Sequence, residues 1–190
     1  FRQYATQGGT GSVVVTGSTA PHGTLAAARG GLGLVARLDR GALRLDTADP
    51  HDLPGALLGH LPAASAAPGV PFSLPADALF GPGRTLDERT RRLRRAGVPS
   101  HHVDRLRALW SPPPARATTF GVTVRDADGV PRRGPRTVTV LDTAVGRVAW
   151  GLDAARRRVL VHPLDRSRLR AELAALLDVH ARHTTASPRP

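Results

Sequence analysis

The sequence predicts an α+β fold in which a pseudo-twofold antiparallel β-sheet is flanked by helices. Short β-rich runs separated by turn residues occur in two groups of four, and each group is followed by a helical pattern. Corresponding positions of the two groups are separated by a constant 116 residues. The first set is Leu45, Asp49, Leu53, Leu57 and Leu61, and the second is Val161, Asp165, Leu169, Leu173 and Leu177. An internal repeat of this kind indicates two related halves.

The first repeat is expected over about residues 12–61. Its strands are predicted at residues 12–16, 24–28, 33–38 and 42–45. The turn Asp39-Arg40-Gly41 joins the last two strands as a hairpin. A helix with its leucines on one face is expected to start at Asp49-Pro50, with Asp49 as the N-cap.

A linker rich in Pro, Ala and Gly follows the first repeat and leads through Phe72-Ser73-Leu74-Pro75, a short extended piece, to a helical hairpin. Thr85-Leu86-Asp87-Glu88 is a capping box for the first helix, which Gly97 ends. Ser100 is expected to cap the second helix, and Pro112-Pro113-Pro114 to end it.

The second repeat is expected over about residues 118–181, with a helix from about Asp165 to His180. Its strands are predicted at residues 119–125, 137–141, 147–152 and 158–162, with a long loop at 126–135 and a turn at 142–145. We therefore expect a single domain over residues 1–190. In it, the linker and helical hairpin (62–117) join the two pseudo-repeats.

Composition excludes several kinds of protein. The chain has 190 residues, which is enough for a sizeable core, and no cysteine, so disulfides and thiolate metal sites are excluded. No apolar run approaches the roughly 20 residues that a membrane-spanning helix needs. Aromatic residues make up only 4%, so the core must consist mainly of Val, Leu and Ala.

The net charge of +12 makes a basic nucleic-acid-binding protein the alternative function. Arginines gather between Arg89 and Arg95, and again at Arg132, Arg133 and Arg136. The sequence around both groups lacks the aromatic residues for base stacking and the base-reading helix that nucleic-acid binders use. Every basic residue of the 27 is arginine, as the codon bias of a high-GC genome produces, so we expect no specific nucleic-acid partner.

Two Asp-Thr segments resemble the strand ends of an aspartic protease, which needs two carboxylates that share a proton. Leu45-Asp46-Thr47-Ala48 and Leu141-Asp142-Thr143-Ala144 lie 96 residues apart, not 116, so the repeat does not superpose them. Both also lack the glycine of the protease turn. We interpret them as strand-end turns held by Asp and Thr side chains.

Other motifs give no chemistry. His101-His102-x-Asp104 is the one histidine cluster, but neighbouring residues on a helix point about 100° apart and cannot easily share one ion. Gly8-Gly9-Thr10-Gly11 precedes a strand, whereas phosphate loops follow one and open a helix. We therefore predict no catalytic residue, no metal ligand and no cofactor, and a protein that is not an enzyme.

Several motifs, in this order and spacing, carry a family resemblance. They include Phe120-Gly121-Val122-Thr123-Val124-Arg125-Asp126, the Arg-Arg-x-Pro-Arg segment ending at Arg136, and Asp142-Thr143-x-x-Gly146-Arg147. Phe72-Ser73-Leu74-Pro75-Ala76-Asp77-Ala78-Leu79 and Leu93-Arg94-Arg95-Ala96-Gly97-Val98 agree as well. Together they resemble the EspG-type ESX secretion-associated proteins of actinobacteria. The family's first strand and first long helix would then lie before Phe1.

The resemblance implies a cytoplasmic, non-enzymatic chaperone of type VII (ESX) secretion with a quasi-twofold fold. Such a protein binds the tip of a helical PE–PPE pair and keeps it soluble for export. The client here is expected to be a helical secreted protein, PE/PPE-like or WXG-like. No membrane contact is expected, and the chain should be a monomer or a weak dimer.

The resemblance also indicates which residues contact the partner. They belong to the loop after the family's second strand and to the second helix of the hairpin. They are Ser18, Thr19, Pro21, His22, Val103, Leu106 and Trp110. Among the rare large side chains, Trp110, Phe120 and Trp150 either line an apolar groove or belong to the core.

Overall fold

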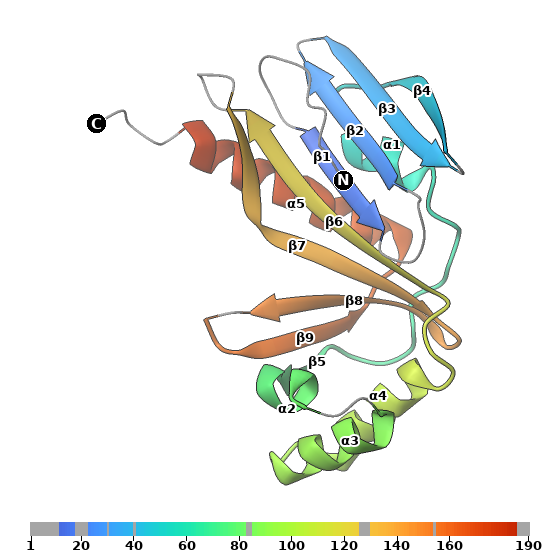
Figure 1. Cartoon of the computed structure of the whole chain (residues 1–190), viewed down its shortest axis with the longest axis vertical. Coiled ribbons are helices and arrows are strands. Elements are labelled where there is room, and N and C mark those ends of the chain that lie inside the picture. Colours follow the sequence, from blue (N-terminus) through green and yellow to red (C-terminus); the bar gives the residue numbers. More distant parts are fainter. Residues whose placement is uncertain are drawn as a thin grey trace. The chain divides into compact units, whose positions relative to one another are not determined.

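A computed structural model describes residues 12–17, 23–29, 31–39, 41–82, 85–125, 130–153 and 155–185 (Figure 1). The strands are β1 (Ser12–Gly17), β2 (Gly23–Arg29), β3 (Leu32–Asp39), β4 (Ala42–Ala48), β5 (Phe72–Pro75), β6 (Arg116–Arg125), β7 (Pro131–Thr143), β8 (Gly146–Asp153) and β9 (Arg158–Pro163). The helices are α1 (Leu53–Leu58), α2 (Ala76–Phe80), α3 (Leu86–Arg95), α4 (Ser100–Trp110) and α5 (Arg166–Thr185).

The order of the hydrogen-bonded strands carries the pseudo-twofold pattern. It is β4-β3-β2-β1-β6-β7-β8-β9-β5. From the antiparallel pair β1–β6, four strands run outward in chain order on each side, and a helix follows the last strand of each four. This confirms the predicted α+β class with a pseudo-twofold antiparallel sheet.

The chain forms two compact units that divide it differently from the repeat. The first unit contains Phe1–Ala63, Thr118–Val138 and Arg166–Pro190, and the second contains Ala64–Ala117 and Thr139–Asp165. The predicted linker and helical hairpin thus belong to the second unit, whereas α5 returns to the first. Strand β7 contributes to both units. The description of residues 1–190 as a single domain of two pseudo-repeats stays a prediction.

The core of the first unit lies between its strands and helices α1 and α5. The buried residues are Ala26, Val35, Leu53, Leu57, Val122 and Val124, and Leu176 and Leu177 of α5 pack against them. Ala26 is paired directly with Val35 across β2 and β3, so the two side chains point to the same face of the sheet. Leu53 and Leu57 are one helical turn apart and meet that face.

Helix α1 begins three residues later than predicted, because Asp52 rather than Asp49 is its N-cap. The Gly55 N–H donates to Asp52 Oδ1 over 2.9 Å, which satisfies a donor of the first turn. Asp49 instead accepts from the N–H of His51 and closes the turn before the helix. Arg170 of α5 also pairs with the Asp52 carboxylate, at 2.8 Å between Nη2 and Oδ2.

The second unit packs strands β7, β8, β9 and β5 against helices α2, α3 and α4. Its core is almost wholly aliphatic, as the composition predicts. The core residues are Ala67, Phe72, Leu74, Leu79, Leu93, Val98, Val103, Leu106, Leu109, Leu141, Val148, Val159 and Val161. The capping box of α3 is confirmed, since Glu88 N–H donates to Thr85 Oγ1 and Thr85 N–H donates to Glu88 Oε2.

In the second unit one further prediction is wrong and one helix was missed. Ser100 is the first residue of α4 and makes no capping hydrogen bond; Pro99 precedes the helix in its place. The five-residue helix α2 was not predicted at all. It spans little more than one turn, which is too short to show a helical period in the sequence.

The predicted loop at residues 126–135 is wrong over its second half, because β7 already starts at Pro131. Residues 126–129 lie outside the described residues. Around the start of β7, a ring nitrogen of His180 lies 2.7 Å from the carbonyl oxygen of Arg132. A side chain at Gly134 would come within 3.3 Å of the His180 ring and of the Val122 carbonyl. The segment is a strand, despite its arginines and prolines, because β7 is hydrogen-bonded to β6 in the sheet, and α5 lies close to it.

The repeat predicts burial in the helices but not in the outer strands. Leu53 and Leu57 are buried in α1, as are their equivalents Leu169 and Leu173 in α5. In contrast, Leu43 and Leu45 of β4 are 64% and 58% exposed, although Val159 and Val161 of β9 are fully buried. The difference has a structural cause. Val159 and Val161 share a core with residues of α2, α3 and α4. Leu45 lies opposite Ala36, next to the core-facing Val35, so Leu43 and Leu45 are on the face of the sheet that points away from that core.

Candidate functional site

The Asp142-Thr143-x-x-Gly146-Arg147 motif builds the hairpin between β7 and β8. Arg147 is 1% exposed and holds Asp142 through two contacts, Nε to Oδ1 at 2.6 Å and Nη2 to Oδ2 at 3.2 Å. The hydroxyl of Thr143 donates to the Gly146 carbonyl and accepts from the N–H of Val145. The carboxylate is thus neutralised by a buried guanidinium, which is a structural arrangement and not that of a protease dyad.

Gly146 is required in this hairpin for two reasons. Its φ of 124° lies in a region that residues with a side chain rarely adopt. A Cβ atom there would also lie 2.7 Å from the backbone of Ala67. That backbone bonds to the next residue of the hairpin, since Ala67 N–H donates to the Arg147 carbonyl and Arg147 N–H donates to the Ser65 carbonyl. The motif therefore anchors Ser65 and Ala67, which belong to the predicted linker, to β8.

Substituting Gly146 with alanine is expected to destabilise the protein by about 1–3 kcal/mol, the cost of a strained backbone conformation. Gly151 serves as the control, because a Cβ atom added there meets nothing within 4 Å. Urea denaturation followed by circular dichroism measures both variants. An equal change in Gly146→Ala and Gly151→Ala would contradict the assigned role of Gly146.

The predicted partner-binding residues differ in how far they can reach a partner. Val103 and Leu106 are 0% and 1% exposed and belong to the core of the second unit. Trp110 is only partly buried and packs against the edge of the same core. The other four predicted residues, Ser18, Thr19, Pro21 and His22, lie outside the described residues. Of those described, Trp110 alone has surface for a partner.

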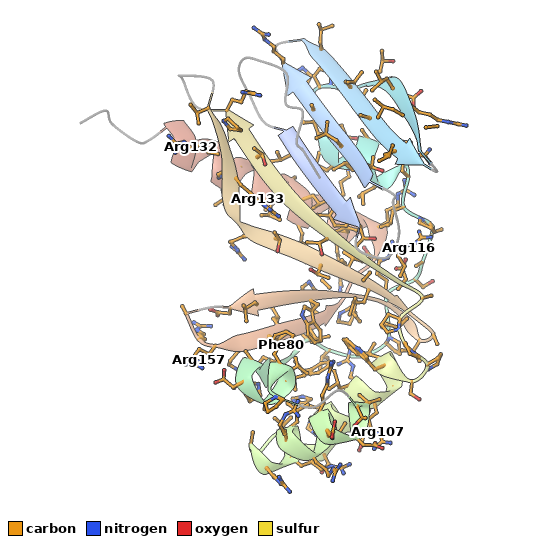
Figure 2. All side chains as sticks on the ribbon, viewed as in Figure 1. Phe80, Arg107, Arg116, Arg132, Arg133 and Arg157 are labelled. Carbon is orange, nitrogen blue, oxygen red and sulfur yellow. The ribbon has the colours of Figure 1, made fainter. Side chains whose placement is uncertain are left out.

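Trp110 belongs to a cluster that the sequence did not reveal, which we call the aromatic surface: Phe80, Trp110, Trp150 and Leu152. The Trp110 and Trp150 rings have centroids 5.0 Å apart, and Phe80 meets Trp150 edge-on at 5.8 Å. Leu152 lies two residues beyond Trp150 on β8 and therefore shares its face of the strand. Phe80 and Leu152 are 58% and 60% exposed. Figure 2 labels Phe80 at the end of α2.

This surface joins three elements that are distant in sequence: the end of α2, the end of α4 and strand β8. The partly buried Trp110 and Trp150 pack against the core, and Phe80 beside them is largely exposed. Large aromatic side chains of this kind, rigid and partly desolvated, dominate the energetics of protein interfaces. Phe120, by contrast, is 1% exposed and is core in the first unit.

The His101-His102 pair is a packing feature. The His102 ring stacks on the Phe72 ring with centroids 5.1 Å apart. The guanidinium of Arg105 also lies over the Phe72 ring, 4.9 Å from its centroid. Burial, and secondarily His101 and Arg105, lower the pKa of His102, which favours the neutral ring. Arg105 itself donates to the carbonyls of Pro68 and Val70. Within the described residues no three His, Cys, Asp or Glu side chains gather as a metal site.

Two of the five arginines of α3 make contacts within the second unit. Arg92 donates to the carbonyls of Ala78 and Pro82, and Arg94 pairs with Asp104 at 3.6 Å. Arg132 and Arg133 project from β7 in the first unit (Figure 2). Nothing in these contacts forms a base-reading element.

Comparison with known proteins identifies a family and a similar solved structure. The model of the EspG family matches residues 8–175. Among solved structures, the chain is similar to the type VII secretion system chaperone EspG5 of Mycobacterium tuberculosis, solved in complex with the PE25–PPE41 dimer. The similarity has a TM-score of 0.64 and 16% sequence identity, and covers 88% of this chain and 72% of EspG5. No curated protein matches the sequence.

The fold and the family agree. None of the helices that the structure describes is long and apolar enough to cross a membrane. The similarity to EspG5 extends over the α+β arrangement with its antiparallel strands. The family match covers most of the chain, including the hairpin motif and the aromatic surface. The chain belongs to the EspG family.

Proposed function

We propose that this protein is a cytoplasmic chaperone of type VII secretion that binds a helical client of the PE/PPE kind and keeps it soluble for export. Membership of the EspG family supports the proposal, together with the fold that the chain shares with EspG5. EspG5 is solved in complex with the PE25–PPE41 dimer. We also propose that the protein is not an enzyme.

The aromatic surface is the proposed client contact on the second unit. A chaperone of this kind must cover an apolar patch on a helical partner, for which an apolar and pre-formed surface is needed. Phe80 and Leu152 present their side chains to solvent, while Trp110 and Trp150 give them a rigid base. Exposed aromatic residues at the centre of such a surface are typical binding hot spots.

A tagged copy of the chain, expressed in its native host, tests the function. Mass spectrometry of the co-purified proteins is expected to identify a PE–PPE pair or a WXG-like helical protein. The proposal fails if the purified chain carries nucleic acid and no helical secreted protein.

The Phe80→Ser variant is expected to lower recovery of that client by about tenfold or more, because it removes an exposed aromatic side chain of the aromatic surface. Since Phe80 is largely exposed, the substitution should change the stability of the fold little. Leu160→Ser is the matched control. Leu160 is also a half-exposed apolar residue of the second unit, but it alternates with the buried Val159 and Val161 and so points to the opposite face of β9. Equal recovery with both variants would place the client contact elsewhere.

A further inference from the structure

Helix α2, which carries Phe80 of the aromatic surface, is too short to be stable by itself. It spans five residues, and its N-cap residue, Pro75, makes no side-chain capping hydrogen bond. Isolated helices of this length do not form in water, because the first turn costs more conformational freedom than its hydrogen bonds offset. Leu79 is the one buried residue of α2. Contacts from neighbouring elements must therefore help to hold the backbone that carries Phe80.

Arg92 of α3 holds the C-terminal end of α2. Its Nε–H donates to the Ala78 carbonyl over 2.9 Å, and its Nη1 donates to the Pro82 carbonyl. These two residues lie two positions before and two positions after Phe80 in the chain. Carbonyls at the end of a helix lack partners within the helix, and a guanidinium can serve two of them at once because its N–H groups form a rigid fork. One side chain thus fixes the backbone on both sides of Phe80.

Arg157, in the turn between β8 and β9, holds the other end of α2. Its carbonyl accepts from the N–H of Ala76, the first residue of the helix, over 2.9 Å. Its Nη2 donates to Asp77 Oδ1 over 2.7 Å. The φ of Arg157 is 51°, the one positive φ of a residue other than glycine in the part of the chain that the structure describes. Such a conformation is unfavourable for a residue with a side chain and persists only where the surroundings hold it, so it points to a function.

We propose that Arg92 and Arg157 are positioning residues of the aromatic surface, which fix α2 at both ends and so set the place of Phe80 beside Trp150. We call the two residues the α2 clamp. The inference rests on the function proposed above, because Phe80 needs a fixed place only if a partner docks on it. A surface that is ordered before binding loses less conformational freedom when the partner arrives, so its affinity is higher. In the clamped position the Phe80 and Trp150 rings have centroids 5.8 Å apart.

Of the two residues, Arg92 is expected to contribute more. The side chains of Arg157 and Asp77 are 73% and 71% exposed, and ion pairs so exposed are screened by salt and stabilise little. Arg92 is half-buried, and its acceptors are backbone carbonyls. A Cβ atom at Gly81 would lie 3.3 Å from Arg92 Nε, so the glycine leaves room for the guanidinium. Arg92 is therefore the residue to substitute.

Hydrogen exchange of the purified chain, followed by NMR at single amides, tests the clamp without any client. In Arg92→Gln the amide of Gly81, which donates to the Asp77 carbonyl in α2, is expected to exchange about tenfold faster. The amide of Ala96 donates to the backbone carbonyl at position 92, which the substitution keeps, and should exchange at its wild-type rate. Arg91→Gln changes an exposed neighbour on the same helix and, as the matched control, should alter neither amide. An unchanged Gly81 rate in Arg92→Gln, or equal acceleration at Gly81 and Ala96, would overturn the proposal.

Client capture tests the consequence of the clamp, with the helical secreted protein that co-purifies from the native host as the probe. Arg92→Gln is expected to lower its recovery about fivefold, and Arg91→Gln to leave it unchanged. In a Phe80→Ser background Arg92→Gln should cause no further loss, because the side chain that it positions is gone. Losses that multiply independently would overturn the proposal. A Phe80→Ser chain that captures the client normally would instead overturn the function proposed for the aromatic surface, while the exchange rates would still decide whether α2 is clamped.

Discussion

Replacing Asp142 with alanine is expected to lower the free energy of unfolding by about 3 kcal/mol, because it leaves the charge of Arg147 buried without its carboxylate. The Arg147 side chain is 1% exposed, and its two short contacts with Asp142 are those of a bidentate pair. Its backbone also joins the hairpin to Ser65, Ala67 and Leu164. Urea denaturation followed by the near-ultraviolet signal of the two tryptophans measures the change.

Two further variants isolate the cause of this loss. Asp142→Ala/Arg147→Met removes both charges and is expected to be more stable than Asp142→Ala alone, since a buried pair can be replaced by apolar groups at small cost. Asp104→Ala breaks the exposed pair with Arg94, which is 3.6 Å long, and is expected to cost less than about 1 kcal/mol. A loss in Asp142→Ala no larger than in Asp104→Ala would show that the buried pair contributes little.

Leu106→Ala is expected to cost about 3 kcal/mol, with a range of about 2–5 for a buried leucine that leaves a cavity. Leu106 is 1% exposed and belongs to the core of the second unit together with Val103 and Leu109. Since it has no surface to offer, the variant should bind the client normally per folded molecule. Denaturation measures the stability, and client capture normalised to folded protein measures the binding.

Phe80→Ser is compared with Leu106→Ala and is expected to change client capture rather than stability. It loses an edge-on contact with Trp150, worth about 1 kcal/mol, but removes an exposed anchor of the aromatic surface. We therefore expect a small loss of stability and a large loss of client capture. If Leu106→Ala, once corrected for folded fraction, loses the client as Phe80→Ser does, the helix face that carries Val103 and Leu106 must open when the client binds.

The strand and helix pattern could be predicted well where local signals agree. The Thr85–Glu88 capping box, the hairpin at Gly41 and the extended piece at Phe72–Pro75 all occur as the sequence indicates. Local signals failed where tertiary contacts decide the conformation. Pro131 and its neighbours look like a loop, but hydrogen bonding of β7 to β6 makes them a strand.

Burial was harder to predict than secondary structure. Val103 and Leu106 form an apolar helix stripe, and a stripe alone does not distinguish a core face from a binding face. The sequence indicated Trp110 and Trp150 as residues of an apolar groove or of the core, but not Phe80, because the three rings meet only through the fold. The partnership of Asp142 with Arg147 could have been found, since the two residues flank a short turn between consecutive strands and carry opposite charges.

The division of the chain into segments sets the order in which the two units can be completed during synthesis. The second unit has all its residues once Asp165 has been made. The first unit waits for α5, whose Leu176 and Leu177 complete the core that begins at Ala26. The first unit, whose synthesis starts before that of the second, is therefore the last to have all its residues. Until then the core that contains Val35 and Val122 is covered by Leu53 and Leu57 of α1 but lacks Leu176 and Leu177 of α5.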